Sequence, residues 1–201
     1  EYYTFMTLSE AERSQLVSEE IFFEPPDLAT LQAGAGAAPY TSDLSEWSDH
    51  RGVYRSTDGG LAVLLNEEDH LRLQAILPGL QAEQAWTAVN ALDDEFGASV
   101  AYAHSDRWGF LTACPTNVGT GLRLSILIHL PALVLTEDME RMTRSLTEMA
   151  FTVRGFYGEG THPVGNLFQV SNQSTLGVEE NKIVEKLTAI TQQIITCEKD
   201  A

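Results

Sequence analysis

Cysteine is scarce in this chain, and long hydrophobic runs are missing. Cys114 and Cys197 are the two cysteines in 201 residues, too few for a disulfide framework, and they do not form a Cys-x-x-Cys metal motif. The longest apolar stretch, residues 124–135, is interrupted by Pro131 and is shorter than the roughly 20 residues that a membrane span needs. These absences argue against a disulfide-rich or transmembrane protein and favour a reducing, cytoplasmic compartment.

Positive charge is also in short supply. Lys and Arg together number 12 against 29 acidic residues, which gives a formal net charge of −17. A field of that sign repels nucleic acid and anionic lipid, so we expect neither as a partner. Lysine is found at Lys182, Lys186 and Lys199, and the remaining basic residues are arginines. Since guanidinium is a planar, permanently charged fork suited to phosphate oxygens, a bound anion is expected to be held by a few local arginines.

The apolar content is high enough for one folded domain over residues 1–201. It reaches 43%, which can supply a sizeable core at this length, and no internal repeat is evident. Helical spacing predicts helices over residues 7–21, 80–96, 136–151 and 179–197. Short apolar runs predict strands over residues 61–66, 71–77, 100–103, 109–112, 122–130, 151–155 and 167–171. Short strands joined by turns, together with a few helices, favour an α+β fold.

Capping residues indicate where two of these helices begin, and one region is predicted to contain neither helix nor strand. Ser9 is the expected N-cap of the first helix, and Thr136 that of the third. A stripe in the third helix is interpreted as core, and it consists of Met139, Met142, Leu146 and Met149. Residues 32–60, rich in Gly, Ala, Ser and Asp, predict a long surface loop or a poorly packed insert. No GK[ST] follows the Gly/Ala run there, so a linker is favoured over a phosphate cradle.

A first polar run, NEEDHLR at residues 66–72, falls between two predicted strands. Extended chain sends alternate side chains to opposite faces, so Glu68, His70 and Arg72 are expected on one side. The alternative is an acidic turn with a hydrated histidine, or a weak metal site made of oxygen ligands. Taken alone, the run does not decide between these interpretations.

Two further runs add a cysteine, two arginines and another carboxylate. In TACPTNVGTGLR at residues 112–123, a glycine-containing turn follows Cys114 and is expected to expose backbone N–H groups beside Arg123. In RGFYGEG at residues 154–160, Arg154 precedes Glu159 in a loop whose glycines allow it to close over a ligand. An isolated cysteine is usually a small buried hydrophobe, so the second run taken alone leaves the role of Cys114 open.

Taken in order, these three runs resemble the catalytic domain of the ATP:guanidino phosphotransferases, the phosphagen kinases, and most closely the bacterial protein-arginine kinases. The resemblance covers about residues 60–198. It implies a curved antiparallel sheet flanked by helices, in agreement with the α+β prediction. Relatives with small substrates generally carry a histidine four residues after the arginine that matches Arg123. Here that position is Leu127 and a histidine follows at His129, as in the protein-arginine branch, which favours a protein substrate.

The resemblance also implies a role for each motif residue. Glu68 matches the carboxylate that holds the substrate guanidinium and acts as base, and Glu159 matches its partner. Cys114 matches the cysteine beside the guanidinium. The arginines that grip the nucleotide phosphates are matched by Arg72, Arg123 and Arg154. ATP with Mg²⁺ is the implied nucleotide, and an arginine-containing protein is the implied acceptor.

These roles agree with the chemistry of the reaction. A guanidinium is protonated at neutral pH and becomes nucleophilic only when one nitrogen is oriented and loses its proton, which two carboxylates can bring about. Phosphoryl transfer then needs in-line alignment and positive charge around the transferring group, which three arginines and a metal ion supply. We therefore expect the pair Glu68 and Glu159 to face the three arginines across a gap the size of one phosphoryl group. Cys114 as a thiolate would stabilise a nearby cation, although it serves equally well as an inert packing residue.

One part of the family pattern is missing. An arginine-rich segment of the form SxRxRxxRN, found in relatives well upstream of NEEDH, has no counterpart here, so a nucleotide-binding segment is expected to be lacking. Two explanations are open: a fragment of a longer kinase, or a variant with weakened nucleotide binding. Two alternative functions also stay open, namely a kinase for a small guanidino substrate and a silent relative that binds arginine or phosphoarginine. A homodimer is compatible with the resemblance, but the sequence does not specify the oligomeric state or the protein targets.

Overall fold

The computed structural model describes residues 2–4, 9, 11–12, 15, 51–155 and 165–201. By its internal contacts the chain divides into two compact units. Unit 1 consists of Glu1–Leu77 and Ala88–Phe96, and unit 2 of Pro78–Thr87 and Gly97–Ala201. The boundary passes through helix α4 (Ala82–Gly97), which confirms the helix predicted over residues 80–96.

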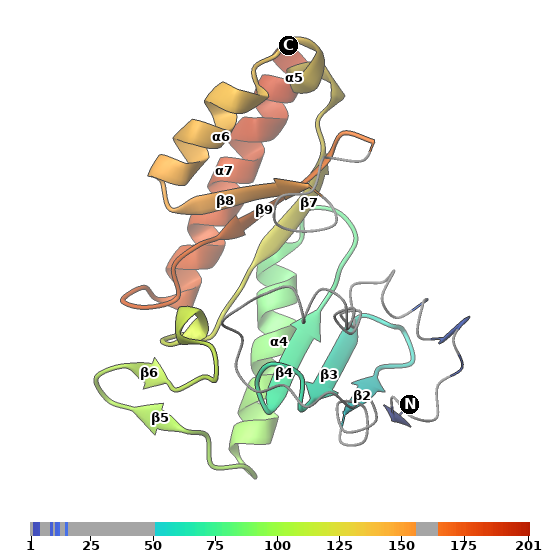
Figure 1. Ribbon diagram of the computed structural model, residues 1–201, viewed down its shortest axis with the longest axis vertical. Helices are drawn as coiled ribbons and strands as arrows, with labels where there is room; N and C mark the ends of the chain where they lie inside the picture. The colour runs from blue at the N-terminus through green and yellow to red at the C-terminus, as the bar shows by residue number, and fades with distance from the viewer. Residues whose placement is uncertain (1, 5–8, 10, 13–14, 16–50, 156–164) are drawn as a thin grey trace, which may run out of the picture. The chain divides into compact units, whose positions relative to one another are not determined.

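Unit 1 contains a four-stranded antiparallel sheet in the order β1-β2-β3-β4 (Figure 1). Its strands are β1 (Tyr2–Thr4), β2 (Gly52–Arg55), β3 (Leu61–Leu65) and β4 (Leu71–Ala75). Val53 and Leu64 are opposite each other in the register and both are 0% exposed, so they form the centre of one sheet face. β3 and β4 confirm the strands predicted over residues 61–66 and 71–77.

Strand β2 corrects the prediction of a long surface loop or a poorly packed insert over residues 32–60, of which residues 32–50 lie outside the described residues. Gly52–Arg55 pairs with β3 through a turn in which Gly59 has φ +74°. The Asp58 carboxylate accepts hydrogen bonds from the Ser56 hydroxyl and from the Gly60 N–H, and in that order these bonds lower the pKa of Asp58. Composition suggested a loop because these turn residues surround a strand of four residues.

Unit 2 is built around a three-stranded antiparallel sheet in the order β7-β9-β8 (Figure 1). The strands are β7 (Ser125–His129), β8 (Phe151–Gly155) and β9 (Leu167–Asn172). The helices are α5 (Pro131–Leu135), α6 (Met139–Glu148) and α7 (Glu180–Asp200). A small hairpin, β5 (His104–Ser105) with β6 (Gly109–Phe110), precedes the 3-10 helix η2 (Pro115–Asn117). The predicted α+β class with antiparallel strands is confirmed.

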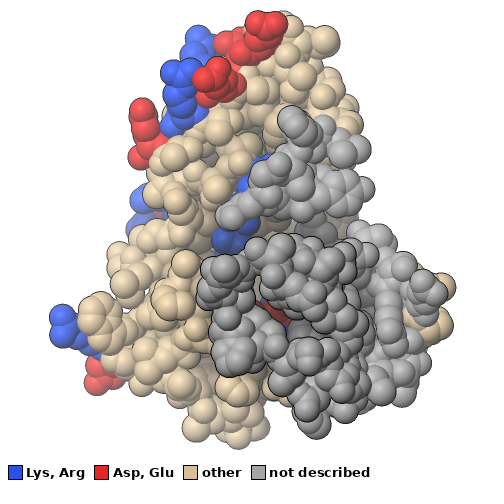
Figure 2. All heavy atoms as spheres, viewed as in Figure 1, with Lys and Arg blue, Asp and Glu red and all other residues tan. Residues whose placement is uncertain are grey.

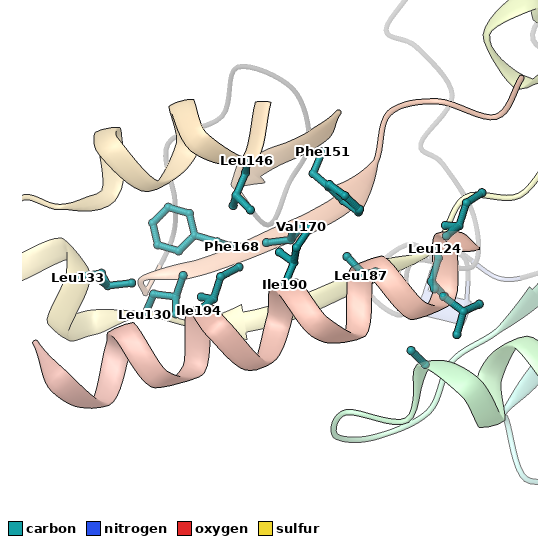
Figure 3. Close-up of a cluster of buried hydrophobic side chains, with 13 residues drawn as sticks. Leu124, Leu130, Leu133, Leu146, Phe151, Phe168, Val170, Leu187, Ile190 and Ile194 are labelled. Carbon is teal, nitrogen blue, oxygen red and sulfur yellow. The ribbon is translucent and has the colours of Figure 1, made fainter. Parts of the chain in front are cut away.

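One apolar cluster in unit 2 joins the sheet to its helices (Figure 3). Leu146 comes from α6, Val170 from β9, and Leu187 and Ile190 from α7. Met139 and Met142 pack against the cluster, as the core interpretation of the methionine stripe requires, whereas Met149 is 47% exposed at the end of α6. Burying a side chain of this size contributes about 1.5–3 kcal/mol, so the cluster fixes which sheet face is covered.

The helix predicted over residues 136–151 is in fact two helices. Thr136 is the C-cap of α5 rather than an N-cap, and its hydroxyl donates to the carbonyl of Ala132. Glu137 follows with φ +63°, a left-handed conformation that interrupts the helix, and Asp138 is the N-cap of α6. Helical spacing continues across this break, so periodicity alone could not locate it.

The start of the predicted first helix shows a reciprocal capping pair. The Ser9 Oγ accepts the N–H of Glu12 at 3.3 Å, and the Glu12 carboxylate accepts the N–H of Ser9 at 2.8 Å. This is the capping-box arrangement, and it confirms Ser9 as the N-cap. Most of residues 7–21 lie outside the described residues. Within the described part of the chain, no helix is long and apolar enough to cross a membrane.

Candidate active site

Glu68 lies in the hairpin loop between β3 and β4 in unit 1. Leu65 pairs with Leu71, and the loop closes through the N–H of Asn66, which donates to the carbonyl of His70 at 3.0 Å. Asn66 has φ +54°, so the run turns sharply at its first residue. The Glu68 side chain is exposed, and its N–H donates to the Glu67 carboxylate at 2.7 Å. Residues 66–70 are not extended, so the strand alternation on which the expectation for Glu68, His70 and Arg72 was based is absent from this loop.

Arg72 lies in the regular part of β4. Its partner in the register is Leu64, and the row continues to Val53 on β2. Opposed residues of an antiparallel pair project to the same side, so Arg72 shares a face with these two buried side chains. Strand pairing thus fixes the backbone from which the half-buried Arg72 side chain departs.

Cys114 opens the irregular segment of unit 2 that leads to Arg123. It is the N-cap of η2, its thiol lies 2.9 Å from the Thr116 hydroxyl, and its carbonyl accepts the Thr112 hydroxyl at 2.7 Å. Thr175, from the loop after β9, donates its hydroxyl to the carbonyls of Thr116 and Val118, each at 2.9 Å. The half-buried thiol is thus held on a short, cross-linked turn.

Two N–H groups of the glycine turn after Cys114 are not exposed as expected. Gly119 N–H donates to the carbonyl of Phe110 at 3.2 Å, and Thr120 N–H donates to the carbonyl of Thr175 at 2.9 Å. Gly119 has φ +115°, and a Cβ there would collide with that Thr175 carbonyl. Glycine is needed for this close approach, and the N–H groups of residues 119 and 120 are used to hold the turn rather than to meet an anion.

Arg123 lies two residues before β7 and is exposed. Both of its neighbours are bound by Asn172: the Asn172 Oδ1 accepts the N–H of Leu124 at 2.7 Å, and its Nδ2 donates to the carbonyl of Leu122 at 3.0 Å. Leu122 and Leu124 belong to the core side of the segment, so Arg123 departs from the opposite side. Asn172 belongs to none of the three motifs, and its bonds reach residues about 50 positions earlier in the chain.

Arg154 lies on β8, on the face of the three-stranded sheet opposite the core cluster. Its cross-strand partner is Gln169, whose partner on β7 is Leu127, 47% exposed. Val153 and Val170 in the next row face the core, so the Arg154 row faces away from it. Arg154 therefore leaves β8 on the side of the sheet opposite the core cluster, and Arg123 leaves the irregular segment before β7 on the side opposite Leu122 and Leu124.

The expected site residues that the structure describes are divided between the two units. Glu68 and Arg72 belong to unit 1, and Cys114, Arg123 and Arg154 belong to unit 2. Glu159 lies outside the described residues. Within the described ranges, no group of three or more His, Cys, Asp or Glu side chains is placed to hold a metal ion. The meeting of the two groups on one ligand stays a prediction.

Comparison with known proteins decides the family. The model of the ATP:guanido phosphotransferase C-terminal catalytic domain matches residues 1–201. The chain belongs to the ATP:guanido phosphotransferase family. This membership confirms the resemblance inferred from the three motifs.

Sequence relatives of this guanido phosphotransferase domain include proteins named protein-arginine kinase. The protein from Halothermothrix orenii is 49% identical over 151 residues, which are 75% of this chain and 43% of that protein. The protein from Desulforamulus reducens is 46% identical over 159 residues, 79% of this chain and 44% of its own length. The chain therefore spans less than half the length of these curated relatives.

Solved guanido kinases share the fold. A duplicated taurocyamine kinase from Schistosoma mansoni, with bound transition-state analogue components, matches the whole chain at 26% identity and a TM-score of 0.81, over 27% of its own chain. A lombricine kinase matches 99% of this chain at 26% identity and a TM-score of 0.74, over 53% of that chain. The expected guanido kinase fold is thus confirmed.

Proposed function

We propose that this chain is the phosphotransferase part of a protein-arginine kinase, which moves the γ-phosphate of ATP to a guanidinium nitrogen of arginine in a protein. The observation that carries the proposal is the match of the entire chain to the guanido phosphotransferase catalytic domain. The choice of acceptor is supported by relatives with that name at 46–49% identity, against 26% for the taurocyamine and lombricine kinases.

In the proposed reaction, the carboxylates act on the acceptor. Glu68 holds the guanidinium and accepts the proton from the attacking nitrogen, and Glu159 orients the same group. The new N–P bond forms as the bond between the γ-phosphorus and the bridging oxygen breaks, and ADP leaves. Because Glu68 is exposed on a hairpin loop, it can reach an arginine presented by another protein.

The arginines act on the nucleotide, which arrives as its Mg²⁺ complex. Arg123 precedes β7, Arg154 lies on β8 and Arg72 lies on β4. Positive charge placed where the phosphoryl group transfers is worth more than charge that must reorganise during the reaction. Cys114, half-buried on its turn, would lie beside the guanidinium and stabilise it as a thiolate. Both cysteines are free thiols, which supports a reducing, cytoplasmic setting.

A transfer assay tests this function. The full-length protein is incubated with Mg-ATP and an arginine-rich protein such as a histone, and acid-labile phosphate on arginine is measured by mass spectrometry at neutral pH. We expect phosphoarginine on the protein and little product with free arginine or creatine. Product on free arginine or creatine alone would assign a small-substrate kinase. Nucleotide binding without product on any acceptor would indicate a binding module instead.

A further inference from the structure

Asn172 is a buried polar residue that the proposed chemistry does not use. It is the last residue of β9 and is 5% exposed. A primary amide can accept at its oxygen and donate twice from its nitrogen, and leaving these groups unpaired in a protein interior costs free energy. Here the oxygen accepts the N–H of Leu124, and the nitrogen donates to the carbonyls of Leu122 and Ser174. Every hydrogen of the amide is used.

Two of these bonds are made to the residues on either side of Arg123. The bonded groups are the carbonyl just before Arg123 and the N–H just after it, at 3.0 Å and 2.7 Å. Holding both fixes the two peptide planes that set φ and ψ of Arg123, and so fixes the direction in which its side chain leaves the backbone. The Asn172 side-chain amide therefore bonds the backbone of residues 122–124 as a neighbouring strand would, although this segment lies outside the sheet.

The position of Asn172 explains why a side chain is needed. The β7-β9 ladder ends at the pair Ser125 and Ser171, and one longer backbone bond, Asn172 N–H to the carbonyl of Leu124 at 3.3 Å, continues it. Beyond that point the chain before β7 turns away toward Thr120, whose hydroxyl accepts the N–H of Leu122. Strand pairing thus does not reach Arg123, whereas Arg154 lies within the β8-β9 ladder opposite Gln169.

From this arrangement we infer that Asn172 is a positioning residue for nucleotide binding, which acts by holding Arg123 in the orientation that meets a phosphate. The inference deepens the proposed function and rests on it. Asn172 itself is buried among backbone groups and contacts no substrate. Its contribution is to place the arginine before the anion arrives, so that the binding free energy is not spent on ordering the segment.

A double-mutant cycle measures this contribution. In the full-length protein, the affinity for Mg-ADP is measured by calorimetry for the native protein, Asn172→Ala, Arg123→Ala and the double variant. We expect Asn172→Ala to weaken binding about tenfold in the native background and less than twofold once Arg123 is alanine. A residue with a merely structural role would lower the affinity by the same factor in both backgrounds.

Thr191→Val is the matched control. Thr191 is 1% exposed in α7, and its hydroxyl donates to the carbonyl of Leu187, so the variant loses a buried hydrogen bond far along the chain from Arg123. We expect it to keep the native affinity for Mg-ADP. Hydrogen exchange gives a second readout: the Leu124 amide should lose protection in Asn172→Ala and keep it in Thr191→Val. Asn172→Ser, which retains one donor and one acceptor, should lie between native and alanine and replaces the alanine variant if that one does not fold.

The outcomes separate this inference from the proposed function. Equal factors in the two Arg123 backgrounds, or native affinity in Asn172→Ala, would overturn the positioning role while leaving the kinase assignment intact. Failure of the native full-length protein to bind Mg-ADP would overturn both. Non-additive loss together with exposure of the Leu124 amide supports the role.

Discussion

The hairpin that carries Glu68 and the segment that carries Arg123 are held in opposite ways. The hairpin is local: Leu65 pairs with Leu71, and Asn66 bonds to His70 across the loop. The segment of residues 112–124 depends on the chain around residues 172–175, about 50 residues further along, through Asn172 and Thr175. A local loop can adapt to varied protein acceptors, whereas a phosphate site benefits from a backbone fixed in advance. The comparison predicts that changes in the two segments affect different steps.

The largest effect is expected from the hairpin. Glu68→Gln should lower the turnover number by about 10²–10⁴-fold, the usual contribution of a general base, because the amide cannot accept the guanidinium proton. Since the side chain is exposed, the fold and the affinity for Mg-ADP should stay native. Steady-state kinetics and calorimetry measure the two quantities. Glu95→Gln, an exposed carboxylate on α4, is the control, and turnover of Glu68→Gln equal to that control would remove the proposed base.

The matching change in the other segment should affect binding. Arg123→Ala is expected to weaken Mg-ADP binding by about 1.5–3 kcal/mol, the scale of a lost charged hydrogen bond. Arg107→Ala serves as control, because Arg107 is an exposed arginine of the same unit that stacks on Trp108 at 4.5 Å. Calorimetric titration measures the affinity of both variants for Mg-ADP. Equal affinities of Arg123→Ala and Arg107→Ala would rule out a phosphate contact at Arg123.

Thr175 tests the non-local tether with a smaller effect. Thr175→Val removes the hydroxyl that donates to the carbonyls of Thr116 and Val118, and should lower the free energy of unfolding by about 1 kcal/mol. Thr175→Ser keeps the hydroxyl and should stay close to native. Urea denaturation provides the comparison. If the valine variant were as stable as the serine variant, the tether would contribute nothing.

The smallest expected effect concerns a position away from both segments. Ala150, after the C-cap of α6, has φ +62°, and it is in this left-handed region that glycine avoids the strain of a Cβ. Ala150→Gly should therefore raise the free energy of unfolding by up to about 1 kcal/mol. Ala189→Gly, at an exposed position inside α7, should lower it by about the same amount. Thermal denaturation of both variants checks the opposite signs.

The charged surface of α6 is a further contrast with the candidate site. Figure 2 shows acidic and basic side chains close together over this helix. Arg141 pairs with Asp138 at 3.0 Å and Arg144 with Glu140 at 2.8 Å, and both arginines are largely exposed. Exposed pairs of this kind contribute little, between about 0 and 1 kcal/mol. Their carboxylate partners give them a local role on the helix, in contrast to Arg123, which departs from an irregular segment.

Sequence patterns located most elements because the patterns are local. Short apolar runs predicted β3 and β8, and helical spacing predicted α4 and α7. The break at Glu137 escaped notice because helical spacing of apolar residues persists across it. Strand β2 was missed because four ordered residues are surrounded by turn-forming ones.

For the candidate site, the sequence indicated which residues to consider but not the hydrogen bonds that position the segments carrying them. The strands predicted around Arg72 and Arg154 are present, and the two arginines have Leu64 and Gln169, respectively, as their register partners. The use of the glycine turn was predicted wrongly, because the partner of the Thr120 N–H, the Thr175 carbonyl, lies far along the chain. Asn172 was overlooked for the same reason, since local patterns do not reveal a bond to residues 122 and 124.

The carboxylates and the arginines are proposed to meet around the transferring phosphoryl group. A crystal structure of the full-length protein with Mg-ADP, nitrate and an arginine-containing peptide tests this most directly, because planar nitrate mimics the phosphoryl group in the transition state. We expect Arg72, Arg123 and Arg154 to contact the phosphates and the nitrate, and Glu68 and Glu159 to contact the guanidinium. A bound nucleotide that Arg123 does not touch, or a guanidinium remote from Glu68, would contradict it.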